Sequence, residues 1–286
     1  MAKLNSVRKG DKAEYISQGI FSSLGYSLQV LRQEDYGIDF LCTLTETSEL
    51  VSYPTKSFTV QLKTSHDNIV YNIKDKTKVK WLFENNLPFF ICYFDSIENR
   101  VDFYSTSMLS HYLITKPTNV TKLSFQMSSG FERNSIYLNE HKSSNKIFKI
   151  NLGRPFLSIS IMDLADDTII NDRKKILDKV LKRENENIVY RNLGLPFMLW
   201  LHEYETNKND FSFGWSHFSV KDIIGSDLLL ENIGHIIISL CFTYKIEDKI
   251  DDYNKLKEFV LKLPFNDEFK SSLINLGFRD KNGIKR

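Results

Sequence analysis

The sequence predicts an α/β domain, with a mixed sheet flanked by helices, followed by a mainly α-helical domain. In the first half, a segment with helical spacing of apolar residues is followed by short segments in which apolar and polar residues alternate, as they do in half-buried strands. In the second half, apolar residues recur at the three- to four-residue spacing of helices. We therefore expect domains at residues 1–155 and 156–286.

The composition is that of a soluble globular protein, with 286 residues, 42% hydrophobic residues and a net charge of +2. This near-neutral balance does not by itself indicate nucleic-acid binding, so any phosphate-binding surface must be local. The longest apolar stretch, residues 232–244, is too short to span a bilayer. No signal peptide is visible, and the expectation is a cytoplasmic protein without membrane attachment. The cysteines, each in an apolar run, are predicted to be buried free thiols: Cys42, Cys92 and Cys241.

The elements of the first half can be assigned in order. Residues 11–24 predict a helix with Ala13, Ile16, Ile20 and Leu24 on one face, and Gly25 is a plausible stop signal. A polar loop containing Pro54 is expected at residues 47–55, and a helix at about 77–86. Strands are expected at residues 26–31, 37–45, 57–64, 88–94 and 101–104.

The second half is expected to be mainly helical. The aromatic-rich stretch 200–217 is interpreted as helical core with one connecting loop, although a binding surface remains an alternative. The sequence contains no glycine-rich phosphate loop, no zinc motif and no Ser/His/Asp set. Helices are predicted at residues 171–186, 196–205, 227–244, 251–263 and 266–276.

Four polar residues in the first half form the candidate site. Glu14 lies on the predicted helix, Asp39 on one predicted strand, and Gln61 and Lys63 on the next strand. Because side chains alternate along a strand, Gln61 and Lys63 share a face, about 7 Å apart. Pairing of strands 37–45 and 57–64 would bring Asp39 close to both.

These residue types suit phosphodiester cleavage, in which a metal ion activates water and neutralises the charge that develops on the phosphate. Asp39 supplies a hard anionic ligand for Mg²⁺ or Mn²⁺, and Glu14 could complete the metal shell. Gln61 can offer an amide oxygen or place the water. Lys63 can stabilise the transition state or help to deprotonate the nucleophile. We interpret the set as a candidate metal-dependent catalytic centre.

The set resembles the PD-(D/E)xK nucleases, and more closely the DUF4365 group and its Mrr-like relatives, which have Gln-x-Lys in place of Glu-x-Lys. The similarity covers residues 8–115 and is carried by the runs Gly10-Asp11-Lys12-Ala13-Glu14, Glu34-Asp35-Tyr36-Gly37-Ile38-Asp39-Phe40 and Val60-Gln61-Leu62-Lys63-Thr64. The resemblance implies a restriction-endonuclease-like fold with Asp39, Gln61 and Lys63 in the active site and Glu14 as the helical acid. Gln61 is the departure, because much of the superfamily has an acid there.

The resemblance also implies a biological role. It suggests Mg²⁺-dependent cleavage of DNA in prokaryotic defence against phage or foreign DNA, controlled by a partner such as a translocating NTPase. A homodimer is plausible because one metal site cuts one strand. Two alternatives stay open: a catalytically inactive interaction module that keeps the fold, and a toxin-like nuclease that cleaves RNA or tRNA.

Residues near the motif add weaker hypotheses. Asp35 lies on the segment that leads to Asp39 and could support the site, or it could simply belong to an acidic turn. A basic run follows the Gln-x-Lys strand and could contact a phosphate backbone, or it could be a solvated helix start. This run consists of Lys74, Lys76, Lys78 and Lys80. The aromatic residues in 88–94 are expected to be buried in a strand rather than to stack on bases.

Overall fold

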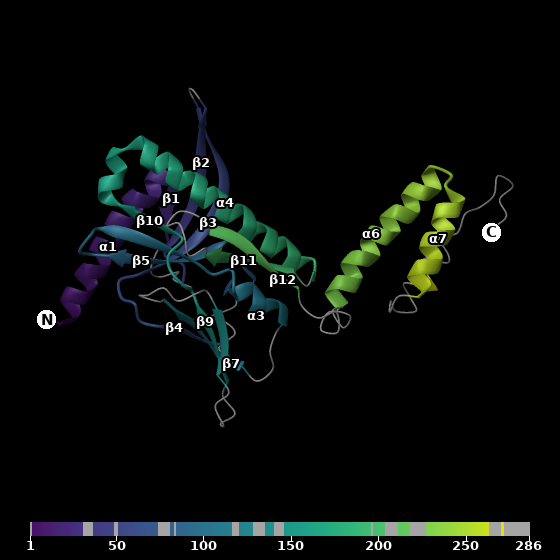
Figure 1. The fold of residues 1–286 in the computed structure, drawn as a ribbon, viewed down its shortest axis with the longest axis horizontal. Coiled ribbons are helices and arrows are strands. Elements are labelled where there is room, and N and C mark those ends of the chain that lie inside the picture. Colours follow the sequence, from purple (N-terminus) through teal and green to yellow (C-terminus); the bar gives the residue numbers. More distant parts are fainter. Residues whose placement is uncertain are drawn as a thin grey trace. The chain divides into compact units, whose positions relative to one another are not determined.

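The computed structural model of the protein divides into two compact units, which are described separately (Figure 1). The first comprises Met1–Arg191 and Phe197–His217, and the second comprises Asn192–Pro196 and Phe218–Arg286. The structure describes residues 2–30, 37–48, 51–73, 81–82, 84–115, 120–127, 135–139, 146–195, 197–203, 211–217, 227–262 and 270–271.

The first unit contains a six-stranded mixed sheet. Its strands β3 and β5 are parallel, and the other neighbouring pairs are antiparallel. In spatial order the strands are β1 (Gly25–Gln29), β2 (Phe40–Ser48), β3 (Val51–Lys63), β5 (Phe89–Asp95), β6 (Arg100–Ser105) and β10 (Leu157–Ser160). The observed α/β class is the class that the sequence predicted.

Two long helices, α1 (Ala2–Leu24) and α4 (Asp167–Asn192), pack on one face of this sheet. The buried cluster between them contains Phe21 of α1, Phe58 of β3 and Leu177 of α4. Burial of each such side chain stabilises the fold by about 1.5–3 kcal/mol. Because side chains alternate along β3, the residues that face away from this cluster include Gln61 and Lys63.

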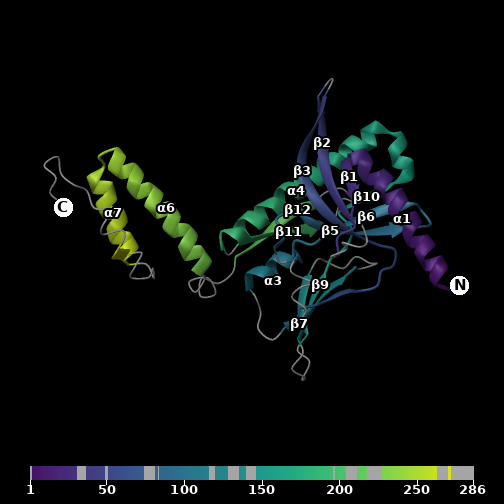
Figure 2. The same ribbon diagram turned by 180° about the vertical axis from the view of Figure 1, so that it is seen from behind.

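A second sheet lies beyond the first and appears below it in both views (Figures 1 and 2). Aromatic side chains pack in its vicinity, with Tyr112 of α3 (Leu109–Thr115) edge-on to Phe148 of β9. The strand order is β4 (Ile69–Asn72), β7 (Val120–Gln126), β9 (Lys146–Asn151) and β8 (Ser135–Asn139). β4 thus belongs to the chain segment that connects the parallel strands β3 and β5.

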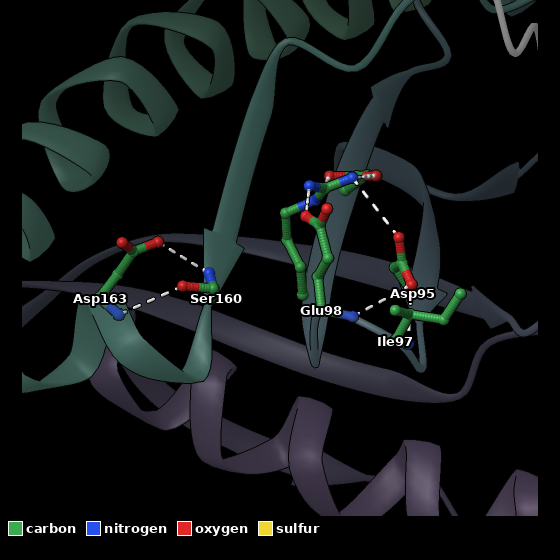
Figure 3. A network of polar contacts seen from close by, with 7 residues as sticks. Asp95, Ile97, Glu98, Ser160 and Asp163 are labelled. Carbon is green, nitrogen blue, oxygen red and sulfur yellow. Dashed lines mark hydrogen bonds and ion pairs between the residues drawn. The ribbon is translucent and has the colours of Figure 1, made fainter.

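The turn between β5 and β6 is held by a polar network (Figure 3). The guanidinium of Arg100 forms ion pairs with Asp95, Glu98 and Asp102. Beside the turn, Ser160 and Asp163 form reciprocal side-chain to backbone hydrogen bonds at the start of the short 3₁₀ helix η2 (Ile161–Ala165). These contacts fix the end of the sheet at β6 and β10.

All five strands predicted for the first half are confirmed with shifted ends. Of the helix predicted at about 77–86, residues 81, 82 and 84 are helical, and residues 77–80 and 83 lie outside the described residues. The predicted loop at 47–55 is wrong, because β2 and β3 continue as a paired hairpin that extends beyond the rest of the sheet (Figures 1 and 2). Pro54 lies within β3, opposite Thr45, where a register irregularity between Thr43 and Thr45 interrupts the ladder. A proline, which has no N–H to donate, is tolerated at such a bulge.

The predicted helix at 196–205 is also wrong. Those residues form β11 (Phe197–Glu203), which pairs antiparallel with β12 (Phe211–His217). A short apolar run has no periodicity that distinguishes strand from helix, so its pairing partner decided the outcome. The aromatic-rich stretch is therefore a hairpin and not helical core.

The expected domain boundary near residue 155 does not coincide with the observed division. β10 pairs with β6, and α4 packs into the main core, because its apolar face covers sheet residues that would otherwise be exposed. The second unit contains α6 (Asp227–Ile246) and α7 (Ile250–Leu261), packed through Ile237, Cys241, Tyr253 and Val260.

The remaining predictions concern the helices of the second half, the cysteines and membrane attachment. The helices predicted at 171–186, 227–244 and 251–263 are present, and nearly all of the one at 266–276 lies outside the described residues. All three cysteines are buried and free, as predicted. Among the described residues, no helix is long and apolar enough to cross a membrane.

Candidate active site

Asp39 is fixed to two strands immediately before β2 begins. Its amide donates to the carbonyl of Val60 at 2.8 Å, and its own carbonyl accepts from the amide of Val30 at 2.9 Å. Its carboxylate Oδ2 accepts a hydrogen bond from the amide of Leu62 at 2.6 Å. A charged acceptor strengthens such a bond, so the Asp39 carboxylate is held against the backbone between Gln61 and Lys63.

Three of the four candidate residues line one cavity of about 240 Å³, here called the edge cavity. Glu14 reaches it from α1, Asp39 from the start of β2 and Lys63 from the end of β3. Among the described residues, the lining consists of Gly10, Ala13, Glu14, Asp39, Leu62, Lys63, Thr64 and Ser65. Small residues at Gly10 and Ala13 leave room beside the helix, so two carboxylates and one ammonium group share an open space.

Glu14 is held by Gln29, the last residue of β1. The side-chain nitrogen Nε2 of Gln29 donates to Glu14 Oε2 at 2.6 Å. Ala13, next to Glu14, is fully buried in the main core, and this fixes the rotation of the helix. Sequence reasoning missed Gln29, because the alternation of Tyr26 and Leu28 with Ser27 and Gln29 predicts that the two apolar residues are buried, whereas the structure exposes them.

Gln61 has a different environment from Lys63, although the two share a face of β3. Its side chain is only 6% exposed and does not line the edge cavity. Its amide oxygen Oε1 accepts a hydrogen bond from the hydroxyl of Tyr71 on β4 at 2.5 Å. The structure therefore brings Glu14, Asp39 and Lys63 together, and places the Gln61 side chain among groups of the second layer.

Gly37 approaches Gln61 and Trp81 closely. It has a φ of +91°, a backbone conformation that glycine adopts without steric cost. A Cβ at this position would lie 2.8 Å from Trp81 Cζ2 and 3.6 Å from Gln61 Nε2. Glycine at position 37, two residues before Asp39, therefore lets the backbone pass close to the side chains of Trp81 and Gln61.

Several predicted residues fall outside the described part of the chain. These are Asp35 and the basic residues Lys74, Lys76, Lys78 and Lys80. Of the aromatic residues expected in a buried strand, Phe89, Phe90 and Phe94 are buried, whereas Tyr93 is half-buried and stacks on His66 with ring centroids 3.8 Å apart.

A second buried polar group, missed by sequence reasoning, lies on α4. Glu184 accepts a hydrogen bond from the hydroxyl of Ser105 at 2.9 Å, and burial raises the pKa of its carboxyl to about 7. It borders a cavity of about 30 Å³ with Arg191, which donates to the carbonyl of Asn85 at 2.8 Å. The available signal was its place on the apolar face of α4, one turn after the buried Val180 and Leu181.

The donors of the edge cavity fit a hard divalent cation. Mg²⁺ binds through one or two carboxylates and keeps several waters, and Glu14 and Asp39 offer two carboxylates in one open space. Among the residues that the structure describes, no three His, Cys, Asp or Glu side chains form a metal-binding group. Comparison of the chain with family models, curated proteins and solved structures returned no match.

Proposed function

We propose that this chain is a divalent-metal-dependent nuclease with a restriction-endonuclease-like domain, and that it hydrolyses phosphodiester bonds of DNA. The observation that supports this most directly is the edge cavity, which Glu14, Asp39 and Lys63 line from three different elements. The order of the elements and the Gln-x-Lys pattern support the same assignment through the resemblance to PD-(D/E)xK nucleases.

The residues of the cavity have distinct proposed roles. Asp39 and Glu14 would hold Mg²⁺ or Mn²⁺, which when bound supplies charge neutralisation at the phosphate and acidifies a coordinated water. Lys63 places a positive charge beside the scissile phosphate and stabilises the charge that develops there. Thr64 also lines the cavity and offers a hydroxyl that can donate to a phosphate oxygen.

The biological part of the proposal rests on the resemblance. Defence against phage or foreign DNA is the proposed role, with an NTPase or another defence protein as the controlling partner. A homodimer would allow both strands of DNA to be cut, because each chain contributes one edge cavity.

A second candidate function is a nuclease-fold interaction module without catalysis. It is favoured by the neutral Gln61 at the position where much of the superfamily has an acid, because the described lining of the edge cavity then presents two carboxylates, Glu14 and Asp39. Calorimetry separates the two candidates, since an interaction module would bind neither Mg²⁺ nor Mn²⁺ at millimolar concentration.

The proposed nuclease activity is tested with purified protein, Mn²⁺ or Mg²⁺, and plasmid DNA, with tRNA as a parallel substrate. We expect nicking or degradation of the plasmid, and its loss in Asp39→Asn, an isosteric change that removes the anionic ligand. Asp172→Asn is the matched control, because Asp172 is an exposed carboxylate on α4 that does not line the edge cavity. Equal cleavage by Asp39→Asn and wild type would refute the assignment, and cleavage of tRNA alone would replace DNA by RNA as the substrate.

A further inference from the structure

We propose that Gln61 is a positioning residue for Asp39 and not a metal ligand. In this proposal it acts through a clamp, the Gln61 clamp, formed by Gln61, Tyr71 and Trp81 around Gly37. The catalytic consequence rests on the proposed nuclease function, whereas the mechanical part concerns the fold alone.

The Gln61 side chain is anchored on the side away from α1 and α4. Its Oε1 accepts the 2.5 Å hydrogen bond from Tyr71, whose ring is itself fixed. The Tyr71 ring is edge-on to Trp81, with centroids 6.2 Å apart, and to Phe125, with centroids 5.9 Å apart. Because Gln61 is almost fully buried, replacing this bond by one to water would require the layers to separate.

Gly37 fits against this anchored group. The position of a Gly37 Cβ is 3.6 Å from Gln61 Nε2 and 2.8 Å from Trp81 Cζ2, so the backbone there passes close to both side chains. The Trp81 indole is in turn edge-on to Phe89 of β5, with centroids 5.2 Å apart. The path of residues 37–39 is therefore defined from one side by the clamp.

The two bonds from Asp39 to β3 lie on either side of Gln61. The amide of Asp39 donates to the carbonyl of Val60, and the Asp39 carboxylate accepts from the amide of Leu62. Any movement of β3 at Gln61 therefore changes both bonds that orient the carboxylate. Through this coupling, Gln61 influences the orientation of the Asp39 carboxylate in the edge cavity, although its own side chain does not line the cavity.

A ligand role would require a different arrangement. The amide oxygen of Gln61 would have to face the space shared by Glu14 and Asp39, yet Gln61 is absent from the lining of that cavity and its oxygen faces Tyr71. A neutral side chain also suits the clamp, because an ionised carboxylate in a buried site is costly unless it is fully compensated.

The mechanical part is tested by hydrogen exchange of the Asp39 amide, measured by NMR in the full chain without metal. Tyr71→Phe deletes one hydroxyl and keeps the ring. We expect hydrogen exchange of the Asp39 amide to accelerate about fivefold, because a factor of about five corresponds to the net free energy of one hydrogen bond. Tyr26→Phe is the matched control, because Tyr26 is exposed on the edge strand β1. Unchanged exchange at Asp39 in Tyr71→Phe would overturn the proposal.

The ligand question is tested by Mn²⁺ titration calorimetry on Gln61→Ala, Gln61→Glu and Asp39→Asn. We expect Gln61→Ala to weaken Mn²⁺ binding about tenfold, as the loss of a residue that orients a ligand does. Gln61→Glu should not tighten the binding, and Asp39→Asn, which removes a ligand, should weaken it at least about 100-fold. Tighter binding by Gln61→Glu, or loss in Gln61→Ala equal to that in Asp39→Asn, would assign Gln61 as a ligand. If the wild type binds no Mn²⁺ and cuts no nucleic acid, the nuclease function fails, while the exchange measurement still decides the clamp.

Discussion

Lys63 and Gln61 lie two residues apart on the same face of β3, yet they belong to different parts of the molecule. Lys63 is half-buried and lines the edge cavity with Glu14 and Asp39. Gln61 is buried and bonded to Tyr71 of the neighbouring layer. The difference shows that strand periodicity determines the face of a side chain, whereas the elements that cover that face determine its chemistry.

The largest expected effect separates these two positions directly. Lys63→Met removes the ammonium group but keeps an unbranched apolar chain, and we expect cleavage to fall about 100- to 1,000-fold. The free energy of unfolding should change little, because Lys63 is half-buried at the end of β3. Gln61→Met should instead reduce stability by about 1–3 kcal/mol, since it leaves the Tyr71 hydroxyl without its acceptor. Urea unfolding measures the stability of the two variants, and single-turnover cleavage measures their activity. Equal loss of stability in Lys63→Met and Gln61→Met would contradict the different environments of the two residues.

The second effect concerns Glu184, which like Gln61 is a buried polar group. Its pKa is raised to about 7 by burial, so the folded state holds a proton that the unfolded chain releases at lower pH. The free energy of unfolding should therefore fall by a few kcal/mol at most as the pH rises from about 4.5 to 7. Above about pH 7 this group should cause no further change. Glu184→Gln keeps an acceptor for Ser105 and should remove this dependence. The measurement is urea unfolding from pH 4 to 8, and a variant with the wild-type slope would exclude Glu184 as its source.

The third effect tests the close approach at Gly37. Gly37→Ala places a methyl group against Trp81 in a positive-φ conformation, and we expect a loss of about 1–3 kcal/mol of stability. Gly19→Ala is the control, because a Cβ at Gly19 meets no atom within 4 Å and alanine favours the helix. It should stabilise the protein by about 0.5–1 kcal/mol. Thermal unfolding compares the pair, and a stable Gly37→Ala variant would show that the clamp does not constrain this backbone.

The smallest effect concerns the support of Glu14. Gln29→Ala removes the 2.6 Å hydrogen bond to the Glu14 carboxylate, and we expect about tenfold weaker Mn²⁺ binding with unfolding nearly unchanged. Gln18→Ala is the control, because Gln18 lies on α1 like Glu14 but does not line the edge cavity. Calorimetry and urea unfolding give the two values. If Gln29→Ala lowered stability without weakening Mn²⁺ binding, Gln29 would be only a link between α1 and β1.

Much of the candidate site could be predicted from residue order. Glu14, Asp39 and Lys63 were expected to converge, and all three line the edge cavity, because helical and strand periodicities determine which side chains face the same direction. The position of Gln61 could not be predicted, since Tyr71 and Trp81 reach it only through the second layer. The Gln29 support was also hidden, because it depends on α1 packing across β1.

The sequence by itself determined the α/β class and most strands of the six-stranded sheet. It also determined the buried state of the cysteines and the helices on both halves of the chain. These properties depend on local alternation, which the chain carries in each segment. Only the tertiary structure decided that residues 197–203 pair as a strand and that β10 and α4 complete the first unit. It also separated Gln61 from Lys63, because strand pairing and burial depend on contacts between segments that lie far apart in the chain.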